Sequence, residues 1–201
     1  MILCFDTETT GFSPYDNDII QLSAIDAETG ETVINQYCGI KHTHDDWSEA
    51  AKINNISPEQ IVDLPSIYDT AETEKVRDIF YNADMLMAYN ALFDLNMLIP
   101  VLGEEWVKEQ SNTYDIMLDY AQWYIQNKDP NFVCKNGEPR YSKLVAAAEM
   151  FDYTFDVHDS LEDVRATAIV FKGLQDIDVE CKQRSYSELV EWDKKHYPWK
   201  Y

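Results

Sequence analysis

Four carboxylates and one histidine stand at points where this sequence is expected to end a strand or begin a helix. They are Asp6, Glu8, Asp94, His158 and Asp163. Carboxylate oxygens are the ligands that hard dications such as Mg²⁺ and Mn²⁺ prefer. An unperturbed histidine has a pKa of about 6.5, so it can accept a proton at neutral pH. These residue types predict a metal-binding site with a proton acceptor beside it, provided that the fold brings them together.

Asp6 and Glu8 have the spacing that places two side chains on the same side of a β-strand. Two like charges held together in a dry cleft repel each other unless a counter-charge is bound. The spacing alone is weak evidence, because Asp26 and Glu28 share it and are expected to be solvated. The first pair differs because it follows an apolar strand and precedes the turn at residues 9–11. An ordinary polar strand end is the alternative interpretation.

Asp94 and Asp163 are each expected near the start of a helix. Asn90 is a good N-cap, which would place Asp94 in or just after the first helical turn, where an acid also complements the helix dipole. Further along, Asp159 can serve as N-cap with Glu162 three residues later. His158 and Asp163 then occupy the two positions that meet across a helix start, as in the hydrophobic staple.

Converging carboxylates could hold two dications about 3.5–4 Å apart, which can clamp the attacking and leaving oxygens of a phosphodiester. His158 would then act as the general base toward water. The predicted reaction class is metal-assisted hydrolysis of a phosphodiester.

Three segments, in this order, resemble the motifs of the DEDDh 3′–5′ exonucleases. They are Asp6-Thr7-Glu8-Thr9-Thr10-Gly11, Asn90-Ala91-Leu92-Phe93-Asp94, and His158 with Asp163 five residues later. The resemblance covers about residues 1–175. It implies a ribonuclease H-like fold, two Mg²⁺ or Mn²⁺ ions, and release of 5′-mononucleotides from a 3′ end.

The resemblance also assigns roles to single residues. It implies metal-ligand roles for the four acids and a general-base role for His158. The residues implied to bind substrate are Thr9, Thr10, Gly11, Phe12, Asn90 and Phe93. The chain departs from the family at Asn54-Asn55-Ile56, where His-Gly-Ile is common, and at Ser160, where Ala is common. The first departure is expected to alter the nucleotide pocket.

The hydrophobic pattern predicts an α/β fold with a mixed five-stranded sheet, three antiparallel strands followed by two parallel ones, flanked by helices. The expected strands are residues 1–5, 19–25, 32–37, 85–89 and 111–114. The expected helices begin near 58, 70, 91, 115, 142, 160 and 186. An exonuclease domain is expected over 1–178, with a helical aromatic and basic tail at 179–201 that packs on the same domain.

Composition narrows the possible substrates. The net charge of −21 disfavours a protein that grips long duplex DNA through its whole surface. Low basicity favours short or single-stranded substrates, and the resemblance implies attack at a 3′ end. We expect the 3′ ends of single-stranded nucleic acid as substrate, with DNA favoured. An exoribonuclease acting on RNA or short oligoribonucleotides is the alternative, and a non-catalytic binding subunit on the same fold is less favoured. A polymerase or another protein is a possible partner, and the sequence does not decide between them.

Four scattered cysteines and the lack of a leader-like or membrane-spanning segment predict a cytoplasmic protein with no membrane partner. One locally basic stretch, residues 127–141 with Lys143, could contact the substrate backbone or be an ordinary surface loop. In the tail, aromatic side chains beside lysines could stack on bases or anchor a partner, although packing onto the domain is favoured.

Overall fold

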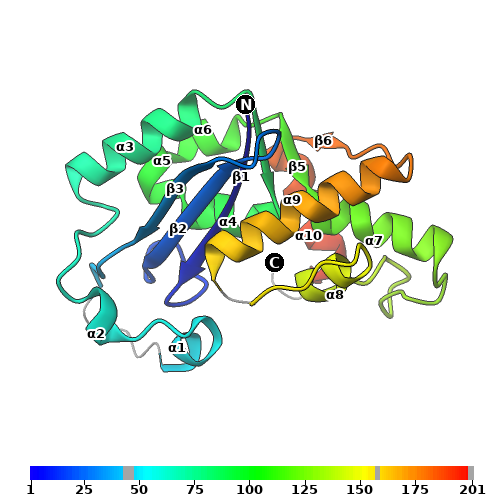
Figure 1. Ribbon diagram of the computed structural model, residues 1–201, viewed down its shortest axis with the longest axis horizontal. Helices are drawn as coiled ribbons and strands as arrows, with labels where there is room; N and C mark the ends of the chain where they lie inside the picture. The colour runs from blue at the N-terminus through cyan, green and yellow to red at the C-terminus, as the bar shows by residue number, and fades with distance from the viewer. Residues whose placement is uncertain (43–47, 157–158, 199–201) are drawn as a thin grey trace.

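The computed structural model describes residues 1–42, 48–156 and 159–198, and these residues form a six-stranded mixed sheet with helices on both faces (Figure 1). The strand order is β3-β2-β1-β4-β5-β6. The strands are β1 (Ile2–Thr9), β2 (Ile19–Asp26), β3 (Thr32–Tyr37), β4 (Met85–Ala88), β5 (Thr113–Asp115) and β6 (Gln183–Arg184). The first three strands are antiparallel, β4 and β5 lie parallel to β1, and β6 is antiparallel to β5.

The predicted α/β fold is confirmed, but the strand count of five was wrong by one. Strand β6 has only two residues, so its sequence carries no alternating pattern that could reveal it. One of its two residues, Arg184, is anchored by a buried ion pair, in which its guanidinium donates to Asp119 Oδ1 at 2.6 Å.

The helices form two layers around the sheet, apart from α1 and α2, which lie beyond the lower end of β1 and β2 in Figure 1. They are α1 (Ser48–Asn54), α2 (Pro58–Ile61), α3 (Thr70–Tyr81), α4 (Ala91–Met97), α5 (Ile99–Leu102), α6 (Glu104–Lys108), α7 (Ile116–Asn127), α8 (Leu144–Glu149), α9 (Ser160–Asp176) and α10 (Tyr186–His196). The short helices α1 and α6 were not predicted. No helix within the described ranges is both long and apolar enough to cross a membrane.

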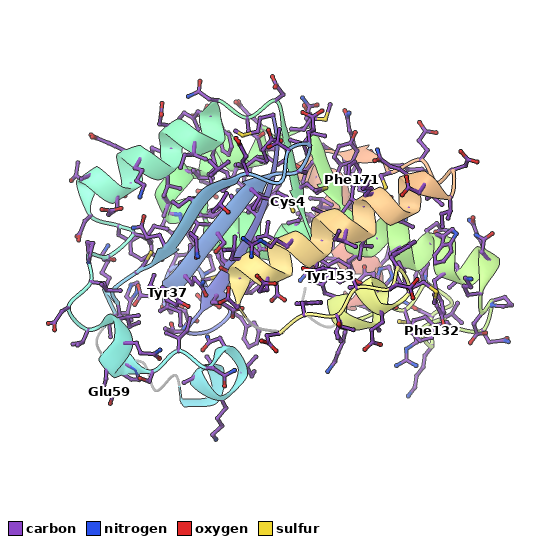
Figure 2. The ribbon with its side chains drawn as sticks, in the orientation of Figure 1. Cys4, Tyr37, Glu59, Phe132, Tyr153 and Phe171 are labelled. Carbon is purple, nitrogen blue, oxygen red and sulfur yellow. The ribbon has the colours of Figure 1, made fainter. Side chains whose placement is uncertain are left out.

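Successive side chains of β1 point to opposite faces of the sheet and pack into two separate hydrophobic cores. Leu3 and Phe5 point into the larger core, where Phe5 meets the edge of Phe80 from α3 at 5.1 Å between ring centroids. Cys4 points to the opposite face and packs under α9, where Figure 2 labels it. Asp6 has the same strand parity as Cys4, so β1 delivers it to the α9 face of the sheet.

Strand β1 extends beyond the end of its parallel neighbour β4. Its pairing with β4 ends at Cys4 opposite Met87, whereas its pairing with β2 continues to Thr9. A register shift between Glu8 and Thr9 marks the end of this pairing. The segment from Asp6 to Thr9 therefore lines an opening between β1 and β4, at the carboxyl edge of the parallel strands, where α/β folds commonly bind ligands.

Helix α10 packs on the larger core beside α4 and α6. Leu189 is buried there, and Tyr186 Oη donates to Asn96 Oδ1 of α4 at 2.7 Å. A capping box at Ser185 and Glu188 starts the helix, as the sequence predicted. The last aromatic residues of the predicted tail, Trp199 and Tyr201, lie outside the described residues.

Candidate active site

Three carboxylates from two distant parts of the chain converge at the open end of β1. Asp6 and Glu8 come from β1 and Asp163 comes from α9, and their ligand oxygens all lie within 4.8 Å of one another. Helix α9 begins at Ser160, and its N-cap residue is Asp159, whose side chain accepts the N–H of Leu161 at 3.0 Å. This cap fixes where the first turn lies, and it places Asp163 over the strand end.

Asp94 reaches the same opening from the other helical layer. Its Oδ1 accepts two hydrogen bonds from Thr7, one from the backbone N–H at 3.0 Å and one from Oγ1 at 2.7 Å. Its side chain is almost completely buried at 2% exposure. Thr7 lies between Asp6 and Glu8 and points to the opposite face of the sheet, so it ties α4 to the strand that carries the other acids. Asp94 is not part of the tight three-residue group, but its charge acts on Asp6.

The acids destabilise one another's charged forms. Burial raises the pKa of Asp6 well above its usual value, and the charges of Asp94 and Glu8 raise it further. Burial, followed by the charge of Asp163, raises the pKa of Glu8 to about 8. Burial also raises the pKa of Asp94 to about 7, although the two hydrogen bonds from Thr7 act in the opposite direction. A site that holds this many carboxylates so close together needs positive charge in order to ionise at neutral pH.

The donor set fits hard dications. All of its ligand atoms are carboxylate oxygens, and oxygen donors with negative charge are what Mg²⁺ and Mn²⁺ require. Asp6, Glu8 and Asp163 would hold such an ion directly, and Asp94 stands beside them in the same field. The predicted grouping of these acids is thus present in the geometry, while their roles as ligands remain a prediction. His158, the predicted base, lies outside the described residues.

Asp115, which sequence reasoning treated only as the start of a helix, fixes the neighbourhood of Asp94. Its carboxylate accepts the N–H groups of Asn90 at 3.3 Å and Ala91 at 3.0 Å, and it accepts that of Leu118 at 3.3 Å. One buried side chain therefore caps both α4 and α7. An acid placed between a strand and a helix is the signal that could have revealed it.

Asn90 is the N-cap residue of α4 and Asp94 lies in the first turn, as the sequence predicted, but the cap works without the Asn90 side chain. Asn90 adopts the left-handed conformation, with φ of 74° and ψ of 52°, and its side chain makes no cap hydrogen bond. Asparagine tolerates this conformation better than most residues. The sharp turn that it permits, together with the N–H hydrogen bonds that Asp115 accepts, directs the start of α4 toward the strand end.

The start of α9 is anchored to the sheet by a buried polar chain. Ser160 Oγ donates to Ser23 Oγ of β2 at 2.6 Å, and Ser23 Oγ in turn donates to Asn35 Oδ1 of β3 at 3.0 Å. Ser160 is fully buried. The family commonly has alanine at this position, so the chain adds a hydrogen bond at the base of the helix that carries Asp163.

A mostly apolar pocket of about 290 Å³ opens beside Glu8. Its lining from the predicted substrate segments consists of Thr9, Thr10, Gly11, Phe12 and Phe93, and helix α1 adds Ala50, Ile53 and Asn54. Phe12 is 87% exposed and meets Phe93 edge-on at 6.2 Å between centroids. Asn90, the remaining predicted substrate residue, does not line this pocket. An exposed aromatic pair over an apolar pocket is suited to stacking on a base.

The first departure from the family pattern forms one wall of this pocket. Asn54 is buried, and its Nδ2 donates to the carbonyl oxygen of Thr9 at 3.4 Å. Asn55 has a positive φ of 57°, a conformation for which the glycine common in the family is suited and which asparagine also tolerates. Sequence reasoning located the departure but missed α1, the helix that carries it.

The chain matches a known protein family. The RNase T family model, described as an exonuclease, matches residues 3–171. The chain belongs to this exonuclease family. The match includes all three predicted motifs, and it confirms the predicted membership among the DEDD-type 3′–5′ exonucleases.

The curated relatives are much longer proteins. The chain is 26% identical over 136 residues to the PolC-type DNA polymerase III of Oceanobacillus iheyensis, an alignment that covers 66% of this chain and 9% of that protein. It is 33% identical over 97 residues to the corresponding protein of Staphylococcus aureus, covering 47% of this chain and 6% of the relative. The chain thus matches less than a tenth of the length of these relatives.

Solved structures share the fold at low identity. Escherichia coli Exonuclease I in complex with a dT13 oligonucleotide matches with a TM-score of 0.69 and 18% identity, over 87% of this chain and 40% of that one. Exonuclease X in complex with 5′ overhanging duplex DNA matches with a TM-score of 0.60 and 19% identity, over 92% of this chain and 98% of that one.

Proposed function

We propose that this domain hydrolyses the terminal phosphodiester at the 3′ end of single-stranded DNA and releases a 5′-mononucleotide. The observation that carries the proposal is the convergence of Asp6, Glu8 and Asp163 within 4.8 Å, in a chain that belongs to an exonuclease family. An isolated cluster of acids would be ordinary on a protein with a net charge of −21. This cluster is half-buried, comes from two separate motifs, and stands beside a pocket suited to a base.

Each residue has a part in the proposed reaction. Asp6, Glu8, Asp94 and Asp163 would hold two divalent ions, Mg²⁺ or Mn²⁺. These ions, when bound, supply the positive charge that a phosphodiester and an attacking water need. His158 accepts the proton of that water, a role that suits an imidazole at neutral pH.

The apolar pocket restricts cleavage to the end of a strand. A terminal nucleotide would place its base in the pocket between Phe12 and Phe93, with its phosphate toward Glu8. The wall formed by Asn54 and α1 limits how far a strand can continue beyond the pocket. Hydrolysis would then release one nucleotide at a time from the end of the strand.

Single-stranded DNA is the proposed substrate because of charge and kinship. A chain of net charge −21 has few cations with which to neutralise the phosphates of the two backbones of a long duplex. The curated relatives are named as DNA polymerases, and Exonuclease I is similar in structure and binds a dT13 oligonucleotide. The kinship with PolC-type polymerases also suggests a polymerase as partner, which we propose as the context in which the domain acts.

A direct assay tests the proposal. The protein is incubated with 5′-labelled single-stranded DNA, or with RNA of the same sequence, in Mg²⁺ and in EDTA. We expect a ladder that shortens from the 3′ end in Mg²⁺, faster on DNA. The Asp163→Asn variant should lose this activity, whereas Glu28→Gln, a change at an exposed acid far from the site, should keep it. Equal activity of the Asp163→Asn variant would refute the proposed site, and faster cleavage of RNA would reassign the substrate.

A further inference from the structure

We propose that a second surface, formed by the 128–143 segment and the end of α10, binds the part of the single-stranded substrate that lies 5′ of the scissile bond. We call it the distal surface and define it by Phe132, Lys135, Arg140, Lys143, Trp192 and Lys195. The inference rests on the proposed function, because it supplies a route for the strand whose 3′ end that function consumes.

The distal surface concentrates positive charge on an acidic protein. The chain has 16 Lys and Arg residues, and four of them, Lys128, Lys135, Arg140 and Lys143, fall within 128–143. The side chains of these four and of Lys195 are exposed. Within the described parts of the chain, they take part in no ion pair, whereas Lys75, Lys108 and Arg165 each pair with an acid on their own helix. Asp129 and Glu138 are the acids of the same segment.

Aromatic rings lie under these cations. The Arg140 guanidinium carbon is 5.1 Å from the centroid of the Phe132 ring, and Lys195 Nζ is 5.8 Å from that of Trp192. Figure 2 shows Phe132 on the lower right of the molecule, at the opposite end from Glu59. Cations and rings in alternation are the arrangement by which proteins bind single strands: the cations meet phosphates, and the rings stack on bases of any sequence.

Tertiary contacts make one surface from these two segments. Asn136 Nδ2 donates to the carbonyl oxygen of Lys195 at 2.6 Å, and the ring of His196 stacks on Tyr141 at 4.3 Å between centroids. Nε2 of His196 lies 2.9 Å from the carbonyl oxygen of Pro139. The loop is braced internally as well, because the Arg140 N–H donates to the Phe132 carbonyl oxygen at 3.0 Å. The cations are therefore held on a fixed frame, which lowers the entropic cost of binding a strand.

The distal surface is joined to the active-site edge of the sheet. Tyr89, which follows β4 and precedes Asn90, donates its hydroxyl hydrogen to the carbonyl oxygen of Ser142 at 2.8 Å. Lys143 follows directly and is the N-cap residue of α8. Glu8 and helix α1 line the nucleotide pocket, and in Figure 1 α1 lies at the lower left of the molecule whereas α8 lies at the lower right, below α9. A strand whose last base enters that pocket can thus leave across Lys143 toward Arg140 and Lys195.

The test compares two charge-matched variants with oligonucleotides of two lengths. The first variant, Lys135→Gln/Arg140→Gln/Lys195→Gln, removes three cations of the distal surface. The second, Lys75→Gln/Lys108→Gln/Lys172→Gln, removes three cations from α3, α6 and the C-terminal half of α9. Affinity for single-stranded DNA of about 20 nucleotides is measured by fluorescence anisotropy in Ca²⁺ over a range of salt, and KM is measured in Mg²⁺ with that DNA and with a trinucleotide.

We expect the first variant to bind the long strand roughly tenfold more weakly, and the salt slope of log K to fall by about 0.7 for each phosphate that the protein no longer neutralises. Its KM for the trinucleotide should equal that of the wild type, because so short a substrate does not reach the distal surface. The second variant should behave as the wild type. If the two variants bind the long strand alike, or if the KM of the first variant rises as much for the trinucleotide as for the long strand, the inference is overturned.

The outcomes separate this inference from the proposed function. A wild-type protein that binds the long strand through these cations but cleaves nothing would support the distal surface and refute the hydrolytic role. If the wild type cleaves DNA and the first triple substitution leaves binding of the long strand unchanged, the hydrolytic role is supported and the distal surface is refuted.

Discussion

The crowded carboxylates predict an unusual pH dependence of stability in the metal-free protein. Burial raises the pKa of Glu8 from its usual 4.5 to about 8 in the folded state. The folded state therefore holds this proton more tightly than the unfolded chain does. The resulting stabilisation is complete below about pH 4.5 and is lost as the pH rises toward about 8, so the free energy of unfolding should fall across this interval.

The size of the effect follows from the separation of the two pKa values. At about 1.36 kcal/mol for each pH unit between them, Glu8 alone accounts for roughly 4–5 kcal/mol. Asp94, whose pKa is raised to about 7, titrates in the same interval and adds to the loss. A loss of this size lowers Tm by roughly 10–20 °C in a protein of this length.

Thermal and urea unfolding in EDTA, at about pH 4.5 and about pH 8, measure the effect. We expect Mg²⁺ to restore stability at the higher pH and to do little at the lower one, because the ions bind ionised carboxylates. The Glu8→Gln variant cannot ionise there and should lose much less stability between the two pH values. Glu28→Gln, a change at an exposed acid, is the matched control and should follow the wild type. Metal-free stability that is constant or rises across this interval would refute the electrostatic account of the site.

Three further changes test how the site is held. Asp115→Ala removes the acceptor of three backbone N–H groups, so we expect the free energy of unfolding in urea to fall by roughly 2–4 kcal/mol. We also expect a lower kcat, because the start of α4 is released. An unchanged kcat would mean that Asp94 does not depend on this cap. His158→Gln should lower kcat about 10²- to 10⁴-fold at unchanged stability, and a wild-type kcat would remove His158 from the proposed role of base. Ser160→Ala breaks the hydrogen bond to Ser23 and should lower the free energy of unfolding in urea by about 1 kcal/mol. It should also weaken Mn²⁺ binding measured by calorimetry. Unaltered Mn²⁺ affinity would show that this hydrogen bond does not position Asp163.

Local sequence determined the secondary structure around the site. The apolar run before Asp6 made a buried strand, and the i, i+2 spacing placed Asp6 and Glu8 on one face of it, because a strand has a period of two. Asp159 was recognisable as an N-cap because a short acidic side chain before a helix accepts an N–H of its first turn. The motifs and their order were enough to predict the family and the fold class.

Tertiary structure alone decided what depends on contacts between distant segments. The sequence could not show that Thr7 binds Asp94, that Asp115 caps two helices, or that Ser160 is tied to β2, because each bond joins residues whose proximity exists only in the folded chain. Helix α1 and strand β6 are too short for a periodic signal, and both are held by packing. The pairing of the 128–143 segment with the end of α10 is of the same kind, because residues 59 positions apart, Asn136 and Lys195, meet only after the core has formed.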